Sequence, residues 1–258
     1  MFSGRVVLLG VYEKMFYRHL TRFANRAPLK DANGINRRNI TVYNRRSSFF
    51  NLPRDGNTYL YGIIGVNTAV FCAWTLAKND RRFFRFMQNN FTASSYGVLQ
   101  KFRFHTLVTA MFSHMDTFHF AANMITLYFF GSQAMMALGT TSFLSLYFAG
   151  GLVASACHIL WPYVIPRSWP ARYSASKYSP GLGASGAISA IVAWTIMRFP
   201  TSMVYIYFMI PVPAALFGVM YIGKDVYDLY QGGSGVGNAS HLGGALVGCL
   251  YFMKRFIR

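Results

Sequence analysis

Ser185 and His241 are the two residues of this sequence whose types could hydrolyse an amide bond together. Ser185 lies in the stretch GLGASGAISA and His241 in ASHLGGALVG, and no other histidine follows Ser185. A serine hydroxyl is a poor nucleophile until a positioned base removes its proton, and an imidazole is a common base. The pair therefore predicts covalent catalysis, with Ser185 as the nucleophile and His241 as the general base.

Amide hydrolysis also needs donors for the negative charge that develops on the carbonyl oxygen. His119 and Asn123 are four residues apart, so on a helix their side chains share one face and can converge on one oxygen. Gly183 and Gly186 carry no Cβ, and we expect them to leave room beside Ser185 for the substrate backbone. These four residues complete a candidate site for peptide-bond cleavage.

Two further glycines, Gly244 and Gly248, follow His241 by three and seven residues. Small residues at such spacing let membrane helices approach closely, so we expect this helix to pack against the one that carries Ser185. Taken singly, each feature also has a structural interpretation: a lone serine returns its hydroxyl to a carbonyl one turn back, and a lone histidine is often a hydrogen-bonded packing group. Only the combination favours catalysis.

The sequence offers no evident acid to orient His241. Beyond residue 57 the carboxylates are Asp80, Asp116, Asp225 and Asp228, and we place all four in loops or at a helix edge. We therefore predict a Ser/His dyad, in which a neutral imidazole avoids the desolvation cost of a buried Asp–His pair.

The composition indicates the environment in which this site lies. The chain is 53% hydrophobic and has 7 acidic against 25 basic residues, which is too apolar for an ordinary soluble domain. The basic residues gather in the N-terminal region and between apolar runs, as in a membrane protein, so the net charge of +18 does not indicate nucleic acid binding. The three cysteines, Cys72, Cys157 and Cys249, lie singly in apolar runs, which predicts buried free thiols and neither disulfide nor metal.

Residues 1–57 are predicted to be a separate basic region. They hold eleven Lys and Arg, spaced at first among Val, Leu, Phe and Tyr. This pattern is typical of a mitochondrial presequence followed by a linker. The alternative is a basic tail that lies on anionic lipid.

Residues 58–258 contain six apolar segments. About 20 residues of helix cross a bilayer, and the six candidates are 58–77, 115–137, 141–161, 183–199, 203–222 and 239–256. The first, third and fifth loops are long, so segments two, four and six all begin at one surface. That places His114, His119 and Asn123 at similar depth to Ser185 and His241, which predicts an all-α membrane protein with an active site near one face.

These motifs resemble those of the rhomboid intramembrane serine proteases. The resemblance rests on HMDTFHFAAN, GASG and ASHLGGALVG in this order, and the longer stretches MFSHMDTFHFAANM and SPGLGASGAISA look most like the mitochondrial, presenilin-associated branch. It covers roughly residues 58–256 and implies the six-transmembrane-helix rhomboid fold. It also implies an inner mitochondrial membrane location.

The resemblance assigns roles to individual residues. It implies that Ser185 is the nucleophile, that His241 is its base, and that His119 and Asn123 help to form the oxyanion hole. His114 would act mainly as a hydrogen-bonding support of the first loop.

The chain also departs from this family pattern. Many members carry a Trp-Arg pair early in the first loop, where this chain has His105 and Thr106, with Arg103 nearby. The fourth residue after the serine is often an aromatic that stacks on the base, and here it is Ser189. Mitochondrial relatives often have an extra helix before the core, which we do not find in residues 1–57.

Three functions remain open from the sequence. The first is an intramembrane serine protease that acts on transmembrane protein substrates in contact with membrane lipid, without metal or cofactor. The second is a catalytically silent rhomboid-like protein that serves as a chaperone or protein-translocase subunit. The third is a transporter or channel, for which paired charges or broken helices at the midplane are expected; Pro211 and Pro213 interrupt segment five, but no charged residue adjoins them.

Overall fold

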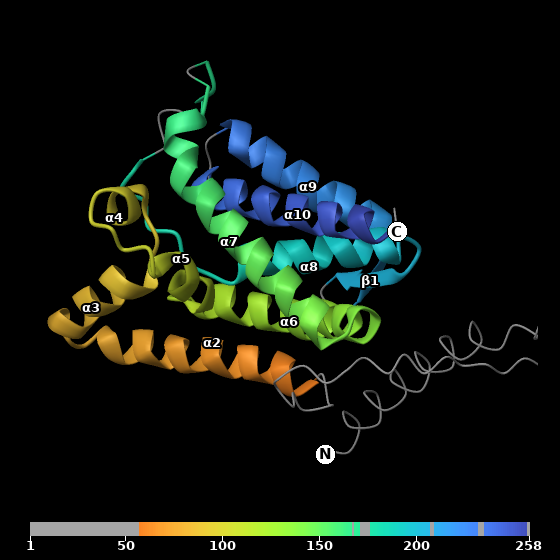
Figure 1. The fold of residues 1–258 in the computed structure, drawn as a ribbon, viewed down its shortest axis with the longest axis horizontal. Helices are drawn as coiled ribbons and strands as arrows, with labels where there is room; N and C mark the ends of the chain where they lie inside the picture. Colours follow the sequence, from red (N-terminus) through yellow and green to blue (C-terminus); the bar gives the residue numbers. More distant parts are fainter. Residues whose placement is uncertain (1–56, 167, 171–175, 207–208, 232–234, 257–258) are drawn as a thin grey trace, which may run out of the picture. The chain divides into compact units, whose positions relative to one another are not determined.

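The computed structural model of the chain describes residues 57–166, 168–170, 176–206, 209–231 and 235–256. The predicted N-terminal region, 1–57, lies outside these residues except for Asn57. Helices make up most of the described part (Figure 1). In chain order the elements are α2 (Asn57–Ala77), α3 (Arg81–Phe91), α4 (Ser95–Leu99), α5 (Thr106–Thr109), η1 (Ala110–Phe112), α6 (Thr117–Leu138), α7 (Thr140–Val164), α8 (Ser185–Arg198), β1 (Met203–Ile206), β2 (Ile210–Pro213), α9 (Ala214–Gln231) and α10 (Gly235–Phe256).

Helix α8 lies at the centre of the helical bundle. It packs against α6, α7, α9 and α10, and every residue from Gly186 to Thr195 is buried. A helix that is apolar on all sides is stable only where other helices surround it. The neighbours of α8 therefore fix the position of Ser185, which is its first residue.

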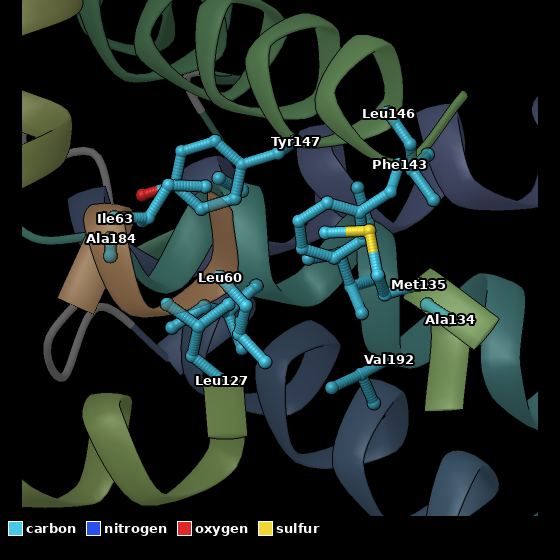
Figure 2. Packing of buried hydrophobic residues seen from close by; sticks show 14 of the residues in the cluster. Leu60, Ile63, Leu127, Ala134, Met135, Phe143, Leu146, Tyr147, Ala184 and Val192 are labelled. Atoms are coloured by element: carbon cyan, nitrogen blue, oxygen red, sulfur yellow. The ribbon is translucent and has the colours of Figure 1, made fainter. Parts of the chain in front are cut away.

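The main hydrophobic core lies between α8 and the helices α2, α6 and α7. Figure 2 shows side chains of α2, α6 and α7 meeting those of α8, among them Leu60, Leu127, Phe143 and Val192. Leu60, Leu127 and Phe143 have no solvent exposure. Burying such a side chain contributes about 1.5–3 kcal/mol relative to leaving it exposed, so this cluster holds α2 and α6 in place.

The long segment between α2 and α6 folds into short helices at one end of the bundle (Figure 1). Hydrogen bonds tie this segment to the bundle: the indole N–H of Trp74 donates to Ser113 Oγ at 2.7 Å. Ser95 Oγ donates to the carbonyl of Ile159 in α7 at 2.6 Å. A backbone bridge pairs Ala93 with Gly181, which connects this segment to the approach to α8.

The structure corrects the predicted fifth segment, 203–222. Its first part is not helical: β1 and β2 form an antiparallel hairpin in which Val204 pairs with Val212 and Tyr205 with Pro211. Proline inside a helix removes a hydrogen bond and clashes with the preceding turn, so α9 begins only at Ala214, after Pro213. It then continues to Gln231, through residues predicted to form a loop. The other five segments coincide with helices to within a few residues.

Two helices of the described part, α2 and α7, are long and apolar enough to cross a membrane, and α8 is a shorter apolar helix. On α2, Cys72 is exposed, and Cys157 and Cys249 are partly exposed, which corrects the prediction that all three are buried. The reason is that an apolar helix at the outside of a bundle presents one side outward, where lipid is its solvent.

Candidate active site

The turn that precedes Ser185 is held from two sides. Gly183 has a backbone φ of +124°, which side-chain-bearing residues rarely adopt, and its N–H donates to the carbonyl of Ala110 at 2.9 Å. The N–H of Ala184 donates to Nε2 of His114 at 3.3 Å. His114 is completely buried, so it supports the backbone directly before the candidate nucleophile.

Ser185 lies at the N-terminus of α8 and is partly buried. No side chain caps this end of the helix, and the first N–H groups of a helix have no carbonyl partner within it. Together with the helix dipole, such groups favour negative charge. The hydroxyl of Ser185 is thus placed beside backbone donors that can share a developing oxyanion.

His119, on the first turn of α6, lies beside the same turn, and Asn123 follows it one turn later on that helix. Asp116 caps α6 by accepting from the N–H of His119 at 2.7 Å, and the amide of Asn123 donates to the carbonyl of His119 at 2.9 Å. A Cβ added to Gly183 would lie 2.9 Å from Cε1 of His119 and 3.7 Å from Oγ of Ser185. Gly183 therefore lies between the imidazole and the hydroxyl.

Helix α10 packs closely against α8 at positions that glycine occupies. A Cβ on Gly244 would overlap the carbonyl group of Gly186, and one on Gly248 would overlap that of Ala190. A Cβ on Gly186 would overlap Ala154 of α7 and lie 3.6 Å from the carbonyl oxygen of Ser240. The space beside Gly186 is thus filled by the protein itself, so this glycine serves helix packing and leaves no room for substrate, contrary to the expectation from the sequence.

The same contact brings the start of α10 to the start of α8. His241 lies one turn before Gly244, and Ser240, its neighbour, is the residue beside Gly186. The imidazoles of His119 and His241 are close enough for their charged forms to repel each other. Among the described contacts no hydrogen bond joins Ser185 to His241; catalytic hydrogen bonds are often long in the absence of substrate.

An acid contacts His241, and this overturns the prediction that none is available. Nδ1 of His241 lies 3.2 Å from Oδ2 and 3.3 Å from Oδ1 of Asp225. The Asp225 side chain is 5% exposed and that of His241 is 24% exposed. The prediction was wrong because Asp225 was placed in a loop, whereas α9 continues through it.

Tyr221, one turn before Asp225 on α9, contacts the other side of the site. Its ring is nearly parallel to that of His241, at an interplanar angle of 18° and a centroid distance of 6.2 Å. Its hydroxyl hydrogen-bonds to Ser189 Oγ at 2.8 Å. The aromatic ring missing at position 189 is therefore supplied by a different helix.

Sequence reasoning missed both Tyr221 and Asp225. They are four residues apart, so a helix that begins after Pro213 places them on one face. The proline pair was the available signal, because it excludes a helix through 211–213 and shifts the apolar face of the next helix toward residue 231.

In the first loop, the two residues found in place of the Trp-Arg pair bond locally. His105 Nε2 contacts Asn90 Oδ1 at 3.1 Å, and Thr106 Oγ1 donates to the carbonyl of Arg103 at 2.7 Å. The Arg103 guanidinium donates to Asn89 at 2.7 Å. The bonds of Arg103 and His105 fix this part of the first loop against α3.

The described residues contain no group of three or more His, Cys, Asp or Glu side chains that could hold a metal ion.

Comparison with known proteins places the chain among mitochondrial relatives. It is 38% identical over 200 residues to RHOMBOID-like protein 12, mitochondrial, of Arabidopsis thaliana, covering 75% of this chain and 57% of that protein. It is 29% identical over 207 residues to the human presenilin-associated rhomboid-like protein, mitochondrial, covering 80% and 50%. Rhomboid protein 1, mitochondrial, of Saccharomyces cerevisiae is 29% identical over 195 residues, covering 74% and 51%. The chain spans about half the length of these curated relatives.

The rhomboid domain matches residues 101–258, which is more than half of the chain. The matched region runs from the end of the first loop to the last helix, and includes Ser185, His241 and the close packing of α8 with α10. This chain therefore belongs to the rhomboid family of integral membrane proteins.

Proposed function

We propose that this protein is an intramembrane serine endopeptidase that cleaves transmembrane protein substrates, with Ser185 as nucleophile and His241 as general base. One observation carries the proposal: the N-terminal ends of α6, α8 and α10 meet, and the residues brought there are a hydroxyl, an imidazole and oxyanion donors. A binding protein of the same fold would not require this set.

The contact with Asp225 determines which nitrogen of His241 serves as the base. Because Nδ1 faces the carboxylate, Nδ1 carries the proton and Nε2 keeps its lone pair. Nε2 would take the proton from Ser185 Oγ as that oxygen attacks the substrate carbonyl. The resulting oxyanion would accept hydrogen bonds from His119, Asn123 and the first N–H groups of α8, and each such donor contributes about 3–4 kcal/mol in serine hydrolases.

The tetrahedral intermediate would then collapse. The C–N bond breaks, the leaving amine takes the proton from His241 Nε2, and an ester forms between Ser185 and the N-terminal part of the substrate. Water, losing a proton to the same nitrogen, would attack this ester; the bond from the carbonyl carbon to Ser185 Oγ then breaks, Nε2 returns the proton to Oγ, and the carboxyl product is released. The proposed cycle uses the side chains named above, the first backbone N–H groups of α8 and water.

The length of α8 indicates where in the membrane this occurs. Its 14 residues extend about 21 Å at about 1.5 Å per residue, whereas the hydrocarbon layer is about 30 Å thick. If its C-terminal end lies at one surface, Ser185 lies some 9 Å beneath the other by the same geometry. A substrate helix would have to unwind locally to offer a peptide carbonyl there, because helical carbonyls are already hydrogen-bonded.

We further propose six membrane-spanning helices, α2 and α6 to α10, in the inner mitochondrial membrane. The names of the relatives, which are mitochondrial, support the compartment. The chain matches only about half the length of each relative. The relatives therefore do not identify the substrate of this chain.

The experiment that tests the proposal uses the full chain in liposomes with a fluorescently labelled single-span substrate. Unaltered protein should release two fragments, and Ser185→Ala and His241→Ala should each lower the rate by more than about a thousandfold. A fluorophosphonate probe, which reacts with activated serines, should label the unaltered protein at Ser185 and neither variant.

Equal fragment release by all three proteins would contradict the proposal. Substrate that copurifies with all three without being cut would instead favour the catalytically silent, rhomboid-like alternative.

A further inference from the structure

We propose that Asp225 is a positioning residue for His241, so that the site works as an Asp–His–Ser triad with its acid supplied by α9. The inference rests on the proposed function, because it concerns the base of that reaction. It goes beyond it by assigning a role to a third helix, which carries neither the nucleophile nor the base.

The burial of Asp225 is the first argument. A carboxylate is costly to bury unless it is paired and hydrogen-bonded, and this side chain is only 5% exposed. Among the described residues, both of its hydrogen bonds go to Nδ1 of His241. The neighbouring cation does not serve it, because Lys224 pairs with Asp228 instead.

The chemistry of the base is the second argument. A carboxylate that accepts from Nδ1–H fixes the tautomer and the ring plane, and it stabilises the imidazolium that forms when the serine proton is taken. The side chain of His241 is 24% exposed, so burial alone does not fix the orientation of its ring. A hydrogen-bonded anchor therefore removes ring orientations that could not reach Ser185.

Tyr221 adds a second constraint from the same helix. Asp225 holds the imidazole at its Nδ1 edge, and the Tyr221 ring covers its face. Tyr221 is itself fixed by its bond to Ser189 of α8, four residues beyond Ser185. One turn of α9 thus fixes the base in two directions and is tied to the helix of the nucleophile.

The ionisable groups that face His241 in the described part of the chain are few. They are Asp225 and Tyr221 on α9 and His119 on α6, with Ser185 at the start of α8. Only Asp225 brings a negative charge next to the imidazole. Loss of that charge should therefore weaken the stabilisation of the imidazolium that forms during catalysis, and so lower kcat with little effect on KM.

The test compares Asp225→Asn with Asp228→Asn in the full chain. The two changes are chemically identical and lie three residues apart on α9, but Asp228 pairs with Lys224. We expect Asp225→Asn to lower kcat by about 10- to 1000-fold, with KM unchanged. Asp228→Asn should match unaltered protein in both kcat and KM, and Ser185→Ala serves as the inactive reference.

Size-exclusion profiles and thermal unfolding in detergent establish that the variants are folded. Should Asp225→Asn not fold, the comparison is made between Asp225→Glu and Asp225→Gln, which match in volume and differ in charge; the Glu variant should then be the faster by tenfold or more.

The outcomes separate the two proposals. If Ser185→Ala is inactive while Asp225→Asn keeps the kcat and KM of Asp228→Asn, the positioning role is wrong and the protease remains. A Ser185→Ala variant that still cleaves would instead refute the proposed function.

Discussion

Gly183 shows how much of the site depends on a residue with no side chain. Its φ of +124° is rare for other residues, and a Cβ there would press on the His119 ring at 2.9 Å. Gly183→Ala should therefore cost about 1–3 kcal/mol of stability and displace His119 from Ser185. We expect at least a tenfold lower cleavage rate per folded molecule, measured with the labelled substrate.

Gly62 provides the control for this change. It is exposed on α2, and nothing lies within 4 Å of its Cβ position. Gly62→Ala should leave the rate unchanged and should not lower the unfolding temperature, since alanine favours the helix more than glycine does. Unaltered cleavage by Gly183→Ala would show that this turn does not shape the site.

The hydroxyl of Tyr221 can be separated from its ring. Tyr221→Phe keeps the stacked ring and removes the hydrogen bond to Ser189, which contributes about 1 kcal/mol. We expect a few-fold loss of kcat in Tyr221→Phe and a larger loss in Tyr221→Leu, which removes the ring. Equal rates in the two variants would mean that the ring face does not support the base.

At the scale of elements, the candidate site divides into a part that the sequence predicts and a part that it does not. Four of the candidate site residues lie in short motifs near the starts of helices: Ser185, His241, His119 and Asn123. An error of a few residues in a predicted helix boundary does not change which of them share a helix. The contact of Asp225 depends on the register of the whole of α9. Apolar content located segment five, but it could not distinguish the β1–β2 hairpin from a helix, since both are apolar.

The packing of α8 against α10 makes a prediction at this scale. A methyl group on Gly244 would overlap the carbonyl of Gly186, so Gly244→Ala must push the two helices apart. Overpacking of this kind costs about 1–3 kcal/mol, and we expect the cleavage rate to fall at least tenfold as His241 moves from Ser185.

The matched control is Gly237→Ala, on the same helix but with nothing within 4 Å of its Cβ position. It should retain full activity. If Gly244→Ala also cleaves normally, then the separation of the two helices is not what aligns the base with the nucleophile.

At the scale of the whole molecule, the proposed six spans predict which segments share a side of the membrane. Single cysteines at Thr140 and Thr201 should react with an impermeant maleimide from one side, and cysteines at Tyr178 and Gln231 from the other. The native cysteines are replaced by alanine beforehand. Labelling of all four positions from the same side would contradict the six-span arrangement.

Among the described helices, α2 and α7 are long and apolar enough to cross a membrane. Helix α8 is shorter, and α9 carries Lys224, Asp225 and Asp228. Its charges pair with one another or with His241, and such pairing is what allows polar groups inside a bundle. The short length of α8 and the charged residues of α9 make these helices look less like membrane spans. The same two helices carry Ser185 and Asp225 of the candidate site.

The seam between α8 and α10 has one more consequence. At Gly244 and Gly248 the helices touch backbone to backbone, so no side-chain rotamers lie between the nucleophile and its base. Side chains at an interface can rearrange and absorb a disturbance, whereas a backbone contact has no such freedom to lose. The distance between the two helices is therefore set by the covalent dimensions of the main chain, and thermal disorder of neighbouring side chains should leave it unchanged.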